Sequence, residues 1–212
     1  MSKQLIEKNL QSTIDEILFG SSDKALSQQI SRLEKAGKIK KIAPRIYTSN
    51  LTEQPEVLVK RNWYKILAHK YPGALLSHRS ALEFKPSLSG EIFITYKYTK
   101  NMVLPGITIR SLKGKGPVNG DTSFFKELYV SQEPRAYLEN MQSSTQKEDS
   151  SKVLSKEAIE EKLNAIVRIR GEDGLNSLRD EARLVADELD MKKEFEQFNK
   201  LVAALADIPF IF

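Results

Sequence analysis

The sequence predicts an α+β fold, and three observations lead to that class. A helical pattern near the N-terminus runs directly into a short basic hairpin. Further along, segments with strand-like alternation are separated by turns, and the C-terminal part carries helical apolar stripes. We therefore expect an N-terminal domain over residues 1–50, a small mixed α/β middle domain over 51–139, a polar linker over 140–156 and a C-terminal helical module over 157–212.

The N-terminal domain is expected to begin with two helices. Residues 3–18 form an amphipathic pattern, with Ile6, Leu10, Ile14 and Ile17 on one face. "FGSSD" interrupts it, and a second helix over about residues 24–36 would be capped by Ser22 or Asp23 and ended by Gly37. The strand-like segments "KIKKI" and "IYTS" then flank the turn "APR".

The middle and C-terminal parts follow simpler patterns. A helix is expected from Val57 to Leu67 and a short one within "ALLSHRSALEF", followed by the strands "EIFITYK", "ITIRSLK" and "ELYVS". The turns "TKNMVLPG" and "GKGPVNGD" separate these strands. After the serine-rich linker, three apolar stripes predict helices, and "GEDG" separates the first two stripes.

Composition excludes several classes of protein. The chain of 212 residues is 40% hydrophobic and 29% charged and contains no cysteine, which excludes disulfides, thiol catalysis and zinc–thiolate sites. No segment approaches the roughly 18 consecutive apolar residues of a membrane helix, and the N-terminus lacks the apolar core of a secretory signal. A cytoplasmic protein is expected.

The net charge of +5 is unevenly distributed along the chain. Between Lys24 and Arg45, Glu34 is the single acid among the basic residues, whereas acids outnumber bases from Glu157 to Glu196. This asymmetry indicates that the N-terminal part meets a polyanion and the C-terminal part does not. A solvated basic face without a partner is the alternative reading of charge alone.

The helix over residues 24–36 has two different faces. Leu26, Ile30 and Leu33 lie on one side of a helical wheel, where they can pack on the first helix. Amides, hydroxyls and cations lie on the other side, which is what a DNA-recognition helix requires, because Gln and Arg contact base edges and Lys and Ser hold phosphates. The residues expected to read bases are Gln28, Gln29, Ser31 and Arg32, with Lys24 beside them.

The following hairpin would supply cations for the DNA backbone. Lys35 at the helix end, Lys38, Lys40 and Lys41 on the first strand, and Arg45 near the tip are the expected phosphate contacts. A helix followed by a basic hairpin predicts a winged helix-turn-helix that binds double-stranded DNA. A basic scaffold with no nucleic-acid function stays the alternative. Regulators of this kind often bind two half-sites about 34 Å apart, so a homodimer is plausible.

The segment "LSQQISRLEKAGKIKKIAPRIYTSN", followed by "PGALLSHRSALEF", resembles the AbiEi-type antitoxin and transcriptional regulator family. The family pattern "LSRL-x-K-x-G" is matched here by Ile30, Ser31, Arg32, Leu33, Lys35 and Gly37, with Ile30 in place of a leucine. Tyr47 matches the family's wing, whereas the usual turn glycine is missing and Pro44 can set the turn instead. The resemblance implies an N-terminal winged helix and autoregulation of a toxin–antitoxin or defence operon.

The segment from Gly171 to Ile208 is similar to the helical segment that precedes the catalytic core of some Fic-type proteins. The Fic signature itself, a histidine-proline-phenylalanine motif followed by a glycine-asparagine-glycine-arginine run, is absent from the chain. The likeness therefore implies a module for sensing or toxin regulation and no nucleotidyl transfer.

Neither catalysis nor a bound cofactor or metal is expected. The two histidines are His69 and His78, and a structural role is the favoured reading of His78. Arg79 can reach either DNA or an acidic partner, and "GKGPVNGD" lacks the spacing of a phosphate-binding loop. An enzyme would require an unrecognised site, such as a deep pocket around His78 with converging carboxylates.

The expected function is thus sequence-specific DNA binding by an antitoxin-like autorepressor. The alternative is a protein-interaction module in which the winged helix serves as a docking scaffold and the acidic helices bind a toxin or a Fic-type enzyme. A toxin protein encoded nearby is a candidate partner, and an adjacent Fic core would favour the alternative.

Overall fold

The computed structural model describes residues 15–142 and 150–206. Three short strands, β1 (Ile17–Phe19), β2 (Lys40–Ala43) and β3 (Ile46–Thr48), form an antiparallel sheet in the order β1-β3-β2. One helix, α2 (Lys24–Lys35), lies between β1 and β2. The small sheet therefore brings the segment before α2 against the second strand of the basic hairpin.

A mixed sheet of six strands forms the middle of the molecule, in the order β6-β7-β5-β4-β9-β8. The strands are β4 (Leu75–Leu76), β5 (Glu91–Tyr96), β6 (Met102–Leu104), β7 (Ile107–Lys113), β8 (Thr122–Phe125) and β9 (Leu128–Val130). β5 pairs in parallel with β7, and β4 with β9, while the other neighbours are antiparallel. Every residue of β5 is buried, as expected for a central strand.

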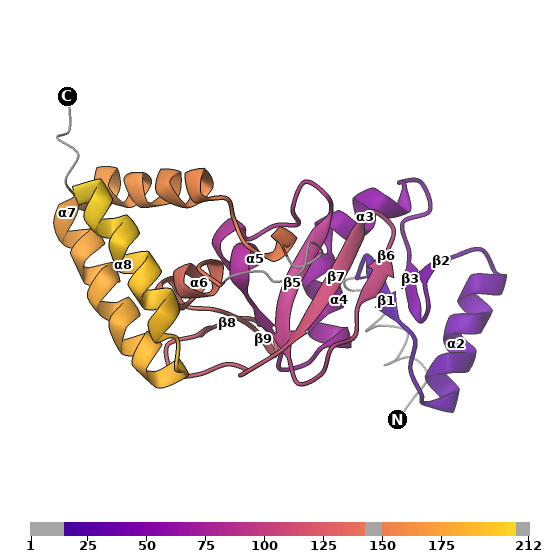
Figure 1. Cartoon of the computed structure of the whole chain (residues 1–212). Helices are drawn as coiled ribbons and strands as arrows, with labels where there is room; N and C mark the ends of the chain where they lie inside the picture. Colours follow the sequence, from indigo (N-terminus) through magenta and orange to yellow (C-terminus); the bar gives the residue numbers. More distant parts are fainter. Residues whose placement is uncertain (1–14, 143–149, 207–212) are drawn as a thin grey trace.

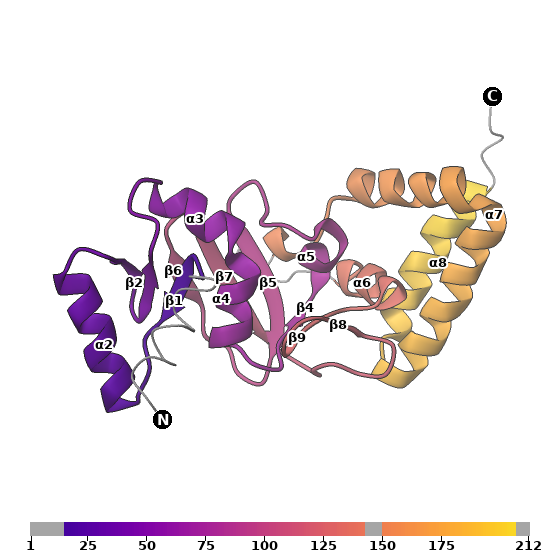
Figure 2. The same cartoon turned by 180° about the vertical axis from the view of Figure 1, so that it is seen from behind.

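Helices α3 (Pro55–Arg61) and α4 (Trp63–Lys70) cover one face of this sheet (Figure 2). Buried Ile17, Ala43 and Ile46 of the small sheet belong to the same apolar cluster as Trp63 and Ile66 of α4. The small sheet and the six-stranded sheet therefore share one core. The short helix α5 (His78–Glu83) follows β4 and packs on α6 (Glu133–Asn140).

The C-terminal part is helical. A short 3-10 turn over Ser150–Lys152 leads into α7 (Lys156–Leu189), and α8 (Lys192–Ala206) follows. Gly171 interrupts α7 with φ 72° and ψ −178°, so the second half of α7 turns away from the first and runs back along α8 (Figure 1). A second core, to which α6 contributes Tyr137 and Leu138, holds these helices together.

The two ends of the molecule differ in both figures. Helix α2 lies at one end, and α7 with α8 lies at the other, with the six-stranded sheet between them (Figures 1 and 2). The basic N-terminal segment is therefore not covered by the acidic C-terminal helices.

Most of the predicted elements are confirmed, with exceptions at several places. The prediction of a helix up to residue 18 is wrong at its end, because Ile17 to Phe19 form β1 and pair with β3; residues 1–14 lie outside the described part. The helix expected over 57–67 is broken at Asn62, whose side chain caps the carbonyl of Leu58.

Several elements were not predicted at all. The short strand β4 lies within the segment expected to be a short helix, β6 lies in a predicted turn, and β8 and α6 had no predicted counterpart. Of the predicted polar linker, residues 143–149 lie outside the described residues, whereas both of its ends are packed. Asn140 is buried in α6, and its side-chain oxygen accepts a hydrogen bond from the Leu154 N–H at 2.9 Å.

Candidate nucleic-acid interface

Helix α2 is held by local signals at both ends. The side chain of Asp23 accepts a hydrogen bond from the Leu26 N–H at 2.9 Å, which satisfies a backbone donor of the first turn. At the other end Gly37 adopts φ 64°, a left-handed conformation that costs glycine little, and the chain turns into β2. The helix is thus terminated where the wing begins.

The predicted polar face of α2 is open to solvent. Lys24, Gln28, Ser31, Arg32 and Lys35 are exposed, while Gln29 is half-buried. On the opposite face Ile30 and Leu33 are half-buried and Leu26 is 50% exposed, and no residue of α2 is fully buried. The amide, hydroxyl and guanidinium groups of this helix are therefore available to a partner.

The predicted cations of the hairpin differ in whether their side chains are exposed or hydrogen-bonded. Lys38, Lys41 and Arg45 are exposed, and Arg45 stands in the turn with φ 59°. The Lys40 ammonium instead donates hydrogen bonds to the carbonyl oxygens of Leu51, at 3.3 Å, and Glu53, at 2.8 Å. Lys40 therefore stabilises the connector after the hairpin and is a weaker candidate for phosphate contact than Lys38 or Lys41.

The structure adds cations that the sequence did not associate with the hairpin. A surface cavity of about 340 Å³ beside the hairpin tip is lined by Pro44, Arg45, Lys70, Tyr71, Tyr98, Lys100 and Met102. The Lys70 ammonium donates to the Pro44 carbonyl at 3.4 Å. Burial, and then the nearby charge of Arg45, lower the pKa of Lys70. Lys70 lies far from Arg45 in the chain, so no local sequence pattern predicts that these two cations line the same cavity.

The region around His78 is the most polar part of the interior. Gln142 Oε1 lies 3.1 Å from His78 Nε2, and because that oxygen only accepts, the ring proton is on Nε2. Nδ1, 3.0 Å from Ser77 Oγ, then accepts from the serine, which in turn accepts from Thr95 Oγ1 at 2.9 Å. Burial lowers the pKa of His78 and keeps the imidazole neutral. Both ring nitrogens are thus used, which is the structural role favoured for this histidine.

A buried ion network lies next to His78. Arg135 Nε donates to Glu139 at 2.9 Å, and its Nη1 donates to Asp121 at 2.5 Å. The same guanidinium donates to the carbonyls of Gly116, at 3.1 Å, and Lys115, at 2.7 Å. Arg135 therefore holds the "GKGPVNGD" loop against α6.

The carboxylate of Glu139 accepts three hydrogen bonds. Besides Arg135, it accepts hydrogen bonds from the backbone N–H of His78 and from the hydroxyl of Ser131, each at 2.9 Å. No second carboxylate lines the cavity at His78 among the described residues. The side chain of Arg79, for which the sequence suggests a contact with DNA or an acidic partner, donates to Glu83, at 2.8 Å, and to the carbonyl of Ser151. The arrangement does not supply the converging carboxylates that an enzyme reading required.

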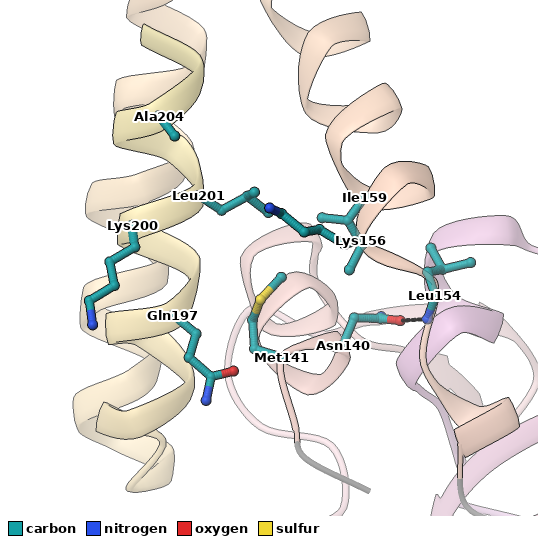
Figure 3. A pocket seen from close by; sticks show the side chains of 9 residues that line it. All are labelled: Asn140, Met141, Leu154, Lys156, Ile159, Gln197, Lys200, Leu201 and Ala204. Carbon is teal, nitrogen blue, oxygen red and sulfur yellow. Dashed lines mark hydrogen bonds between the residues drawn. The ribbon is translucent and has the colours of Figure 1, made fainter. Parts of the chain in front are cut away.

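A further cavity of about 410 Å³ opens between α6, the first half of α7 and α8 (Figure 3). Its walls are Met141, Leu154, Ile159 and Leu201, with the longer side chains of Lys156, Gln197 and Lys200 at the edge. Asn140 is the buried polar residue here, and both ends of its amide are hydrogen-bonded, to Ala136 and Leu154. The cavity therefore combines an apolar wall with the polar side chains of Lys156, Gln197 and Lys200.

No group of three or more His, Asp or Glu side chains in residues 15–142 and 150–206 has the arrangement of a metal site. None of the helices in those ranges is both long and apolar enough to cross a membrane.

Comparisons with known proteins add no family. No protein-family model matches the chain, and no curated protein matches it either. The resemblance to AbiEi-type and Fic-type proteins therefore rests on the sequence motifs alone.

Proposed function

We propose that this protein is a sequence-specific regulator that binds duplex DNA with α2 in the major groove and the β2–β3 hairpin along the backbone. The observation that carries the proposal is the exposed polar face of α2, with Gln28, Ser31 and Arg32, followed in the chain by a hairpin with the exposed cations Lys41 and Arg45. An α-helix with its side chains is about 10–12 Å wide, and the major groove is about 12 Å wide, so α2 can enter it.

The chemistry of this surface supports a division of roles. Gln28 and Arg32 carry the side chains that form bidentate contacts with adenine and guanine, so they are assigned to base edges together with Ser31. Lys35, Lys38, Lys41 and Arg45 are assigned to phosphates, where neutralisation releases counterions. Because Gln29 is half-buried, it is a weaker candidate for base contact than its neighbour Gln28.

The finer assignment, an antitoxin-like autorepressor of a toxin–antitoxin or defence operon, follows from the motif over residues 26–50. A helix-turn-helix also needs a helix before α2; of the segment predicted for it, residues 3–18, the part up to residue 14 lies outside the described residues, and its end belongs to β1. Within the described part, α2 follows β1 directly. The winged-helix assignment is therefore part of the proposal, supported by the α2–β2–β3 order.

Selection of binding sites from random duplexes at two salt concentrations tests this function. We expect an enriched sequence, with an affinity that falls steeply as salt rises, because each neutralised phosphate contributes about −0.9 to the slope of log K against log salt. No enriched sequence at either concentration contradicts the proposal.

A matched pair of variants locates the interface. Arg32→Glu with Lys41→Glu should abolish binding of the selected duplex, as measured by mobility shift. Arg168→Glu with Lys193→Glu changes the net charge equally on exposed residues of α7 and α8, at the other end of the molecule, and should leave binding unchanged. Equal losses in both variants would mean that net charge alone drives binding.

The acidic helices favour a second candidate function, a protein-interaction module. Ile169 is 82% exposed and Leu184 is 71% exposed on α7, so two large apolar side chains of the acidic helices are available to a partner. This function predicts that the product of a neighbouring gene co-purifies with the chain when the two are expressed together. It also predicts that Ile169→Glu with Leu184→Glu abolishes the complex and leaves DNA binding intact.

A further inference from the structure

The cavity beside His78 combines buried polar walls with exposed cations at its edge. It measures about 510 Å³ and lies between the end of β7, helix α6 and the turn from α7 to α8. Ligand pockets for small molecules commonly measure about 300–1,000 Å³, so this space is large enough for a mononucleotide. Thr95, Arg135 and Glu139 of the wall are each almost completely buried.

Three lysines give the cavity its charge. Lys113 and Lys115 come from the end of β7 and the loop after it, and Lys152 comes from the short turn before α7. Within the described residues none of the three forms an ion pair, and only Lys115 has a described side-chain hydrogen bond, to the carbonyl of Glu188 at 3.3 Å. The charge of Arg135, in contrast, is already balanced by Asp121 and Glu139.

The loop that carries two of the lysines is positioned before any ligand arrives. Arg135 holds the carbonyls of Lys115 and Gly116, and the Gly114 N–H donates to the Tyr96 carbonyl. A Cβ atom on Gly114 would lie 2.9 Å from a methyl group of Thr95, so the loop packs closely on β5. A rigid frame of this kind reduces the entropy that a ligand must lose on binding.

Apolar side chains complete one side of the cavity. Leu112, Leu189 and Met191 line it together with the lysines, so a ligand with an apolar ring and a charged group fits the walls better than a simple anion does. Since Lys is a common ligand of phosphate, the favoured charged group is a phosphate.

We propose that this cavity binds a phosphorylated small molecule of mononucleotide size, whose phosphate group is held by Lys113, Lys115 and Lys152. The ligand would contact the middle sheet and the α7–α8 turn at once, and would thereby connect the middle of the molecule to the C-terminal helices. This site is separate from the exposed face of α2, and the proposal does not depend on DNA binding.

Calorimetric titration of the full chain at constant ionic strength tests the proposal. The probes are AMP, GMP, CMP, UMP and ATP, with adenosine and inorganic phosphate as partial ligands. We expect at least one of the nucleotides to bind, inorganic phosphate to bind more weakly than that nucleotide, and adenosine to give no signal. The absence of binding by all five nucleotides at millimolar concentration would overturn the proposal.

Variants place the binding at this cavity. Lys113→Ala with Lys152→Ala should weaken nucleotide binding on the order of a hundredfold, since each charge-assisted contact is worth about a factor of ten or more. The exposed pair Lys85→Ala with Lys193→Ala is the matched control and should bind as the unaltered chain does. Thermal unfolding without ligand should be unchanged in both double variants.

The DNA-binding surface is a competing source of phosphate affinity. The variant with Arg32→Glu and Lys41→Glu should therefore retain nucleotide binding in full. If it loses nucleotide binding while the Lys113 and Lys152 double variant keeps it, the site is on α2 and the present assignment is wrong.

Discussion

Helices α2 and α8 lie at opposite ends of the molecule and differ in how deeply their apolar faces are buried. In α8 Phe198, Val202 and Leu205 are buried against α6 and α7. In α2 no residue is fully buried, and Leu26 is half exposed. Both helices are amphipathic in sequence, yet only α8 uses its apolar face to build a core.

This difference indicates how the two ends can serve different purposes. Most of the stability of a short helix comes from packing of its apolar face, so α8 is bound to the fold by its own burial. Helix α2 relies more on its caps and on β1 and β2, to which it is connected at both ends. It can therefore present a continuous polar face without disturbing the core.

The largest expected effect comes from truncating the centre of the C-terminal core. Phe198 is fully buried, and its ring centroid lies 5.5 Å from that of Tyr137. Phe198→Ala should lower the free energy of unfolding by about 3–5 kcal/mol because it leaves a cavity. Leu26→Ala should cost about 1 kcal/mol or less, since half of that side chain is already in water. Urea unfolding measures both, and equal losses would show that the apolar face of α2 is covered in solution.

Two glycines provide a smaller, matched effect. Gly171 has φ 72° and ψ −178°, a conformation almost restricted to glycine, whereas Gly37 at the end of α2 has φ 64°. A Cβ atom at either position has no neighbour within 4 Å, so alanine tests the backbone alone. Gly171→Ala should cost about 1–3 kcal/mol.

Gly37→Ala should cost about 1–2 kcal/mol, in the left-handed region that glycine normally occupies at helix ends. Thermal unfolding of both variants measures the two losses of stability. If Gly171→Ala is without effect, the bend in α7 is not fixed by its backbone.

The smallest effect concerns the acid side of the pH profile at the N-terminal end. Hydrogen bonds from Arg61, and further ones from Asn62 and Asn50, lower the pKa of Glu16 to about 2 against the opposing effect of burial. A lowered pKa means that this carboxylate stabilises the fold above about pH 4.5. The contribution is lost as the pH falls towards about 2.

Glu16→Gln should remove that pH-dependent part, and because its main partner Arg61 is 48% exposed and screened by solvent, the loss should be roughly 1 kcal/mol or less at neutral pH. Unfolding midpoints measured between pH 2 and pH 6 for both proteins provide the test. Parallel pH profiles for the two would contradict it. The exposed Asp23 has no ion pair among the described residues, and Asp23→Asn, which keeps a capping side chain, serves as the control.

Local signals in the sequence predicted much of this protein. Asp23 caps α2 and Gly37 ends it, the strands β5, β7 and β9 coincide with the expected segments, and the C-terminal stripes lie on helices. These features depend on residues within a few positions of each other, where capping, alternation and helical spacing act directly. The exposed faces of the candidate interface follow from the same spacing.

Other features were decided by contacts between distant residues. Ile17 continues a helical pattern, yet it forms a strand because pairing with Thr48 and burial in the shared core are worth more than one further helical turn. The sequence predicts Lys40 as a phosphate ligand, and only the tertiary structure shows that its ammonium donates to carbonyl oxygens of the connector. The cavity at His78 joins residues of α5, β5, β7, α6, α7 and the 3-10 turn before α7. Its existence depends on the free energy of the whole packed structure, which no local pattern in the sequence reports.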